Sequence, residues 1–408
     1  MNFEFIHCGD LHLGCYPNHI DQRFDDFFDA FQRLIDYAIT NQIHLVLICG
    51  DLFHLKNINS KTLQRTIDLL EIAKENTIEV VAIEGNHDRA FYIDEESWLY
   101  FLNNQGYLKL LNSRIDNGKI VFENYVDGSG NTIETDSYKI IGLGYLGGST
   151  DKYISDMKKT LIKSDKFTII MMHAAVNRLT DQMMGDVKKE VIDNAIKSKV
   201  DYIALGHIHN RYEYDDYIYN PGSLENIRLK DGINSNGKGF YHVKVNDGKK
   251  EVTFINSNPR VIHFESVNVE GMESPLSVTE HIMNKEYVYK KGEMLDLRLY
   301  GKSKFNPYLI SNSILDNIVS KYELLYGEFT NHINVQTNNQ SIDDTMDVND
   351  IIKSYINTDI KNNYPDVKDS EVISEQMLSI ANDILEDDVE NLVDKIIKMG
   401  VKIWFLIN

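Results

Sequence analysis

Five short apolar segments, each followed directly by polar side chains that can bind metal, constrain this chain more than any other feature. They are Phe3–Cys8, His44–Cys49, Glu79–Ile83, Phe167–Met172 and Asp201–Leu205. Short apolar runs bounded by Gly, Asp or Asn are typical of buried strands. Helical patterns separate the first three, so the sequence predicts an α/β fold with βαβ units and a largely parallel sheet covered on both faces.

Three segments between and after the first strands have the periodicity of amphipathic helices: Asp21–Asn41, Ser60–Glu75 and Asp94–Asn104. In the first of them, apolar residues recur every three or four positions and form one apolar face. Functional residues of such folds collect at the carboxyl ends of the strands. We therefore expect the site at that edge of the sheet.

The pattern changes after about residue 210, where aromatic-rich or alternating runs are separated by turn residues. These runs predict antiparallel strands at Arg211–Tyr214, Tyr217–Asn220, Gly239–Asn246 and Glu251–Asn256. They would form a second sheet or extend the first.

A smaller α/β segment is predicted beyond Pro259, with helices at Glu273–Lys285 and Asn306–Ser320 around a strand at Glu293–Leu299. A polar stretch, Gln336–Thr345, resembles a linker. Two helices, Val348–Asn363 and Glu371–Met399, would follow it. The length of 408 residues suggests two or three domains, and we place the boundaries at 1–260, 261–337 and 338–408.

Charge and cysteine content narrow the class of protein. Asp and Glu outnumber Lys and Arg 62 to 42, a net charge of -20, which argues against bulk electrostatic binding to nucleic acid or an anionic membrane. Cys8, Cys15 and Cys49 match no zinc spacing, and their odd number argues against a disulfide framework. With no signal peptide and no apolar run of about 20 residues, we expect a cytoplasmic protein with no membrane partner.

Metal-capable side chains follow all five strands. In extended backbone, residues two apart point the same way, so Asp10 can face the same point as His12, and His207 the same point as His209. Each fragment alone is a weak signal, although Gly85–Asp88 is sharper because a Gly-Asn turn before His-Asp is a poor way to build an apolar core. Five such fragments in order are hard to obtain by chance. The candidate ligands are Asp10, His12, Asp51, Asn86, His173, His207 and His209.

The donor types constrain the metal. Two carboxylates, an amide oxygen and four imidazoles, with no suitable thiolate, favour manganese, iron or zinc in a catalytic site over a structural zinc. Seven ligands are too many for one tetrahedral ion. A pair of divalent ions about 3.5–4 Å apart, bridged by one carboxylate, accommodates them.

These motifs resemble the five phosphoesterase motifs of the calcineurin-like metallophosphoesterases, and those of the SbcD-type DNA repair nucleases most of all. The segments that carry the resemblance are Asp10-Leu11-His12, Gly50–His54, Gly85–Asp88, His173, Gly206–His209 and the later Asn220–Ser223. The resemblance covers residues 1–260 well and 261–337 loosely. It implies a sandwich of mixed sheets flanked by helices, a small α/β capping domain for DNA-end recognition, and a C-terminal helical region.

The resemblance also implies residue roles. One metal would be held by Asp10, His12, Asp51 and His209, and the other by Asp51, Asn86, His173 and His207. Asp51 is then the bridge. His87 would protonate or stabilise the leaving alkoxide, with Asp88 orienting its imidazole and His54 positioning the phosphate.

The implied function is a manganese-dependent DNA exonuclease, with single-strand endonuclease activity left open. It would act in DNA repair as a homodimer with an SbcC-like coiled-coil ATPase, which the C-terminal helices would dock. The alternative enzyme is a phosphodiesterase or phosphatase that acts on a small nucleotide or phosphoprotein. A third hypothesis is a non-catalytic scaffold that retains the fold. The roughly 150 residues after the catalytic domain favour the nuclease, since small-substrate members of the broader family often need little beyond the catalytic core.

Overall fold

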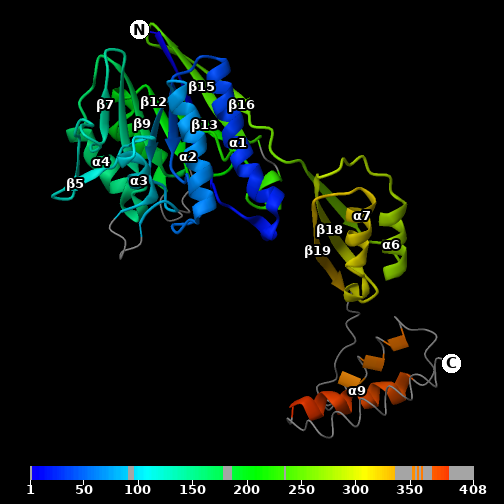
Figure 1. The fold of residues 1–408 in the computed structure, drawn as a ribbon. Coiled ribbons are helices and arrows are strands. Elements are labelled where there is room, and N and C mark those ends of the chain that lie inside the picture. The colour runs from blue at the N-terminus through cyan, green and yellow to red at the C-terminus, as the bar shows by residue number, and fades with distance from the viewer. Residues whose placement is uncertain are drawn as a thin grey trace. The chain divides into compact units, whose positions relative to one another are not determined.

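The computed structural model describes residues 2–90, 96–177, 186–233, 236–335, 352–353, 356–357, 360–361 and 370–385. The chain divides into two compact units, Met1–Val261 and Ile262–Asn408 (Figure 1). None of the helices in the described ranges has the length and apolar character that crossing a bilayer requires. Cys8, Cys15 and Cys49 are buried and free.

The first unit contains two six-stranded mixed sheets. The first sheet is ordered β16 (Lys249–Asn256), β15 (Gly239–Asn246), β1 (Asn2–Cys8), β2 (Leu45–Cys49), β3 (Glu79–Ile83) and β4 (Lys109–Leu110). In it β1 to β4 are parallel, and β15 is antiparallel to both β1 and β16.

The second sheet is ordered β13 (Tyr212–Tyr214), β14 (Ile218–Asn220), β12 (Tyr202–Gly206), β9 (Phe167–His173), β8 (Tyr138–Gly144) and β7 (Thr132–Glu134). Its four central strands are parallel, and the edge strands β13 and β7 are antiparallel to their neighbours. Two smaller pairings are β5 (Arg114–Asp116) with β6 (Lys119–Val121), and β10 (Val176–Asn177) with β11 (Val187–Lys188).

The two sheets pack face to face, because apolar side chains of both fill one core between them. Phe5, Leu47 and Val81 come from the first sheet, and Ile169 and Tyr202 come from the second. The outer face of the first sheet is covered by α1 (Asp21–Thr40), α2 (Ser60–Glu75) and α3 (Trp98–Asn104). The outer face of the second is covered by α4 (Thr150–Thr160) and α5 (Lys189–Ala195).

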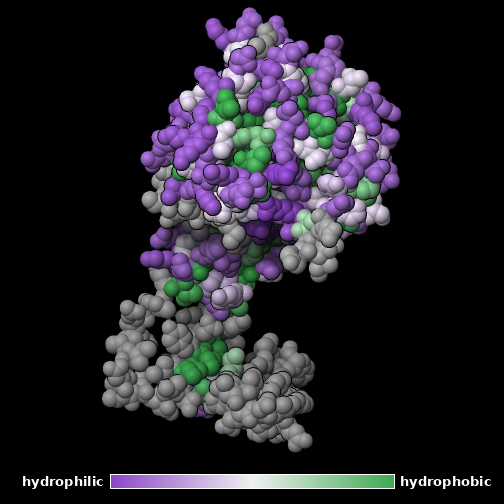
Figure 2. All heavy atoms as spheres, turned by 90° about the vertical axis from the view of Figure 1, so that its left-hand side faces the viewer, coloured by the Kyte–Doolittle hydropathy of each residue, from purple (hydrophilic) through white to green (hydrophobic). Residues whose placement is uncertain are grey.

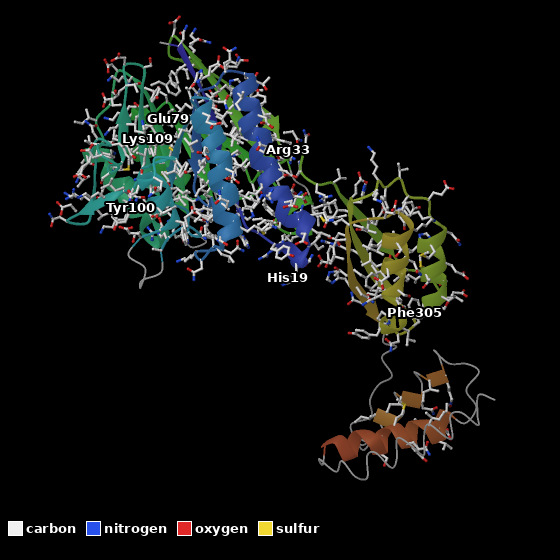
Figure 3. The ribbon with its side chains drawn as sticks, viewed as in Figure 1. His19, Arg33, Glu79, Tyr100, Lys109 and Phe305 are labelled. Atoms are coloured by element: carbon white, nitrogen blue, oxygen red, sulfur yellow. The ribbon has the colours of Figure 1, made fainter. Side chains whose placement is uncertain are left out.

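This layering confirms the predicted sandwich of mixed sheets flanked by helices. The expectation of one sheet with helices on both faces is wrong, because β9 and β12 belong to the second sheet. The apolar stripes of the helices lie inward, and the face of the first unit seen in Figure 2 is mostly hydrophilic. At the surface, Lys109 of β4 forms an ion pair with Glu79 of the neighbouring β3 (Figure 3).

The second unit has a core of its own around a parallel sheet of β17 (Ile262–Asn268), β18 (Met294–Ser303) and β19 (Tyr326–Val335). Side chains of α6 (Pro275–Asn284) and α7 (Ser313–Lys321) pack into that core. The helix predicted over Asn306–Ser320 is a short 3-10 turn, Pro307–Leu309, followed by α7.

Helix α9 (Ser370–Leu385) is the last described element. It agrees with the first half of the helix predicted over Glu371–Met399, and the rest of that prediction lies outside the described residues. Most of the predicted helix Val348–Asn363 also lies outside them.

His7 joins the two sheets through a fully buried imidazole. Its Nδ1 is 2.9 Å from the Tyr202 hydroxyl oxygen, and its Nε2 is 2.9 Å from the Leu205 carbonyl oxygen. Because a carbonyl only accepts, Nε2 carries the proton and Nδ1 accepts from the tyrosine. Burial lowers the pKa of His7 from 6.5 to about 3. The native sandwich therefore holds this ring neutral.

The neutral His7 makes stability depend on pH. The unfolded chain binds a proton near pH 6.5 and the native chain only near pH 3, so stability is lost as pH falls between those values. Between pH 7 and pH 5 we expect wild type to lose about 2 kcal/mol more unfolding free energy than His7→Gln, whose amide can keep both hydrogen bonds. Urea unfolding at the two pH values measures this, and equal losses in both proteins would contradict it.

Candidate metal centre

The carboxyl ends of β1, β2, β3, β9 and β12 meet at one edge of the sandwich, and the predicted ligands follow them. Three groups of side chains have ligand atoms within 4.8 Å of one another: His12, His54 and His87; Asp10, His12 and His209; and Asp10, Asp51 and His173. Asn86 and His207 lie against His173, as described below. The structure thus brings all seven predicted ligands together.

In one half of the cluster, the Nε2 atoms of His12 and His209 lie 3.2 Å apart. The Nε2 of His12 is also 3.8 Å from Oδ2 of Asp51. Two imidazole nitrogens and a carboxylate oxygen facing one point are the donor set of a transition-metal site.

In the other half, Oδ1 of Asn86 lies 3.1 Å from both Nε2 of His173 and Nδ1 of His207. The Nε2 of His173 is 3.4 Å from Oδ2 of Asp51. The same carboxylate oxygen therefore faces both halves of the cluster, where a bridging ligand has to lie.

The loops that carry these side chains are held in unusual backbone conformations. Asp10, His12, Asp51 and His207 all have φ in the left-handed region, at 53°, 48°, 52° and 92°. Each such non-glycine residue costs about 1–3 kcal/mol and persists only where its surroundings fix it. Here the backbone amides of Asp10 and His12 donate to the carbonyls of Gly50 and Asp51, both at 3.0 Å. Strain of this kind is typical of functional sites.

Two glycines leave the space that Asp51 and His173 need. A Cβ on Gly85 would lie 2.0 Å from Oδ1 of Asp51, and a Cβ on Gly50 would lie 2.3 Å from Nδ1 of His173. Gly50 also has a φ of +84°, which other residues rarely adopt. The glycines that precede the polar residues after β2 and β3 thus have a steric reason.

Because the cluster is buried, its carboxylates stay ionised only when a positive charge lies beside them. Burial would raise the pKa of Asp51, but His173 and His12 outweigh it and hold that pKa below its ordinary value. Burial also opposes a proton on His173, yet Asp51 and Asp10 raise the pKa of His173 to about 9. Buried carboxylates here need a cation beside them, and a divalent ion bound by the same atoms would supply one. The donor set therefore fits the predicted ions.

His87 lies beside the cluster with its ring fixed from one side. Its backbone amide donates to Oδ1 of Asp51 at 2.9 Å, and its Nδ1 donates to the His54 carbonyl oxygen at 2.6 Å. The rings of His54 and His87 stack with centroids 5.6 Å apart. Because Nδ1 is occupied, Nε2 is the atom of His87 that can exchange a proton with a ligand.

The predicted role of Asp88 is wrong. Its carboxylate does not orient His87 but accepts from the backbone amides of Leu52, Phe53 and Gly85 at 3.2, 3.0 and 2.9 Å. Burial, with Asp51 nearby, raises the pKa of Asp88 to about 7. The residue fastens the loop after β2 to the loop after β3, and the His54 carbonyl orients His87 instead.

Sequence reasoning missed three residues that support the ligands. Oδ2 of Asp231 is 3.8 Å from Nδ1 of His209. The buried Lys238 ammonium donates to the His209 carbonyl at 2.8 Å and to the Ser223 hydroxyl at 3.1 Å. The Tyr145 ring centroid is 5.8 Å from that of His207 and 6.1 Å from that of His173. Asp231 and Lys238 follow none of the strands of the site, so no local pattern marks them. Tyr145 directly follows β8, and the apolar run that ends at Gly144 is the signal that could have found it.

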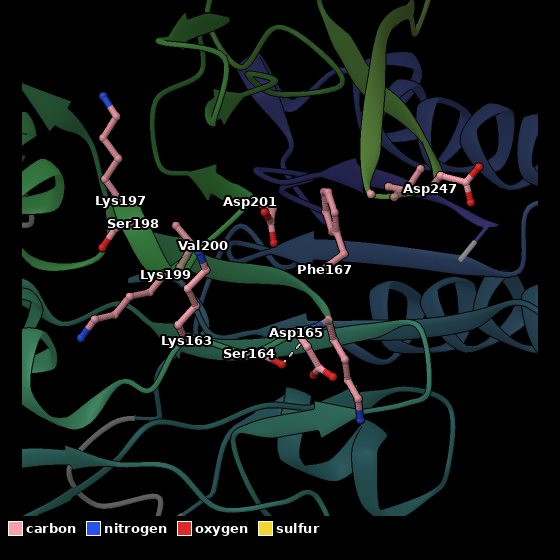
Figure 4. A pocket seen from close by; sticks show the side chains of 13 residues that line it. Lys163, Ser164, Asp165, Phe167, Lys197, Ser198, Lys199, Val200, Asp201 and Asp247 are labelled. Carbon is pink, nitrogen blue, oxygen red and sulfur yellow. Dashed lines mark hydrogen bonds between the residues drawn. The ribbon is translucent and has the colours of Figure 1, made fainter.

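A larger cavity, about 780 Å³, lies at the other end of β9 and β12 (Figure 4). Four lysines line it: Lys163, Lys166, Lys197 and Lys199. Lys199 donates to the carbonyls at the end of α4, and Lys166 pairs with Glu134. None of the seven candidate metal ligands lines this cavity. We therefore place the chemistry at the opposite ends of these strands, where the ligands cluster.

The sandwich and its two-part cluster of Asp, Asn and His at the strand ends define a metallophosphoesterase. Residues 3–211 match the sequence model of the calcineurin-like phosphoesterases, and the chain belongs to this family. The predicted family resemblance is confirmed.

Several archaeal relatives carry the name DNA double-strand break repair protein Mre11. The Archaeoglobus fulgidus protein is 29% identical over 66% of this chain and 63% of its own length. The Sulfolobus acidocaldarius protein is 21% identical over 97% of this chain and 98% of its own length. The Nanoarchaeum equitans protein is 25% identical over 77% of this chain and 87% of its own length. The chain thus spans just under two thirds of the first relative and nearly all of the second.

The space at Gly85 gives a direct prediction. Gly85→Ala should displace Asp51 and weaken manganese binding by about 10- to 100-fold, the usual effect of disturbing a group that supports metal ligands. Titration of metal-free protein with manganese measures the affinity. The control is Gly148→Ala, since a Cβ there meets nothing within 4 Å. Equal affinities for the two folded variants would contradict the steric argument.

Proposed function

We propose that this chain is a metal-dependent nuclease that hydrolyses phosphodiester bonds of DNA during repair or end processing. The observation that carries the proposal is the Asp51 carboxylate facing two groups of ligands, with the non-ligand His87 beside it. The relatives named for DNA double-strand break repair support the substrate, and one of them aligns with 97% of the chain.

Two divalent ions would be held by this cluster. Asp10, His12, Asp51 and His209 would bind one, and Asp51, Asn86, His173 and His207 would bind the other. The mixed nitrogen and oxygen donors, without thiolate, suit manganese. When bound, such a pair activates water and neutralises charge on the phosphate oxygens.

The histidines beside the ligands would handle the phosphodiester. With Nδ1 of His87 donating to the His54 carbonyl, the imidazolium form of His87 would give its Nε2 proton to the leaving oxygen and become the neutral ring. The His54 ring, stacked on His87 with Nδ1 3.4 Å from Nδ1 of His12, is placed to contact the phosphate. Asp88 takes no proton-transfer role, because its oxygens accept three backbone amides.

The proposal also gives a role to each of the two segments that follow the catalytic domain. Residues 261–337 would form a cap that recognises DNA ends, and residues 338–408 would dock an SbcC-like coiled-coil ATPase. The resemblance to SbcD-type nucleases supports a homodimer. A phosphatase or phosphodiesterase of small substrates is the alternative outcome of the activity assay.

The ligand and proton-donor roles can be separated by two variants. Asp51→Asn should lose much of the bound manganese, because it weakens the one ligand that both ions share. His87→Gln should keep wild-type metal content and lose about 100- to 10,000-fold of the cleavage rate on a labelled duplex oligonucleotide. Elemental analysis and single-turnover cleavage measure the two effects.

Undiminished cleavage by His87→Gln would contradict the proton-donor role, and two ions still bound to Asp51→Asn would contradict the bridge. Hydrolysis of nucleotides or phosphopeptides without cleavage of any DNA would favour the alternative enzyme.

Removal of residues 339–408 tests the docking role. The shortened chain keeps every proposed ligand, so we expect manganese-dependent cleavage of short oligonucleotides at the wild-type rate. Co-purification with the ATPase should be lost when the two proteins are expressed together. Retention of the ATPase by the shortened chain would refute the docking role.

A further inference from the structure

A cavity of about 370 Å³ opens beside the candidate metal centre, on the side of His87. Its lining is His54, Leu55, Lys56, Asn57, Asn86 and His87. Of the seven candidate ligands, only Asn86 reaches it. The volume is at the low end for small-molecule sites, which is room for one nucleoside but not for an oligonucleotide.

Leu55 supplies the apolar part of this lining. The Leu55 side chain is 58% exposed, whereas Leu52 and Phe53 just before it are at most 1% exposed. The chain therefore turns outward after the buried loop and presents one aliphatic side chain next to polar catalytic groups. Contact with a ligand would remove this apolar surface from water, which is favourable.

The imidazoles of His54 and His87 both line the cavity. The two rings are stacked, with planes inclined by 21° and centroids 5.6 Å apart. The hydrogen bond from His87 Nδ1 to the His54 carbonyl oxygen fixes the pair. Nucleic-acid bases pack on flat π faces and on apolar side chains without regard to base identity. The charge of Lys56, also in the lining, suits a ligand that carries phosphate.

We propose that this cavity binds the nucleoside attached to the leaving oxygen, with its base packed on Leu55. The inference rests on the proposed nuclease function. If Nε2 of His87 gives its proton to the leaving oxygen, the sugar bonded to that oxygen lies on the His87 side, and this cavity is the space there. Leu55 is then a positioning residue for the scissile nucleotide, whatever its base.

The test uses a short oligonucleotide with one natural phosphodiester between methylphosphonate linkages, so that one bond can be cleaved. Two further versions carry an abasic residue on the 5′ or the 3′ side of that bond. The end groups of the products identify which oxygen leaves, and so which side is the leaving side. Full-length wild type, Leu55→Ala and Leu55→Met are compared with manganese. The control is Ile162→Ala, an 80% exposed aliphatic residue of the same unit.

We expect wild type, Leu55→Met and Ile162→Ala to lose about tenfold in kcat/KM when the leaving-side base is removed. Leu55→Ala should cleave the intact substrate about tenfold more slowly and show no further loss on the leaving-side abasic version. Its manganese content should match wild type. Equal slowing of all three substrates by Leu55→Ala, or an unchanged preference for the base, would overturn the nucleoside site. Wild type cleaving none of the substrates would overturn the nuclease function itself.

Discussion

The carboxylate of Asp51 is the group on which the arrangement of this edge depends. Its Oδ2 faces His12 in one half of the cluster and His173 in the other, and its Oδ1 accepts the amide of His87. It therefore connects the loops after β1, β2 and β3 with the last residue of β9, a strand of the other sheet. Asp51 can occupy that position because its backbone is left-handed and because Gly85 has no Cβ to collide with its carboxylate.

The sandwich supplies the rigidity that such loops need. A core shared by the two sheets aligns the carboxyl ends of five strands, and His7 ties β1 to β12 by hydrogen bonds within that core. A net charge of -20 gives the chain no general attraction for a polyanion. Recognition of DNA would then depend on cations held locally by Asp10 and Asp51, and on contacts such as that of Leu55.

Much of the site could be predicted because strand ends are marked in the sequence. The change from an apolar run to Gly and polar residues locates the end of β3 at Ile83 and places β9 and β12 within one residue. The division into two sheets could not be predicted, since a strand buried under helices and one buried under another sheet have the same apolar pattern. Contacts of Asp88 and Lys238 depend on loops distant in sequence, so no spacing rule reveals them.

Anomalous diffraction from crystals of the manganese-loaded chain would test the bridging role of Asp51 most directly. We expect two anomalous peaks about 3.5–4 Å apart, both within ligand distance of the Asp51 carboxylate, and neither bound by His87. A single peak, or a peak coordinated by the neighbouring group of His12, His54 and His87 and not by Asp51, would contradict the two-metal centre.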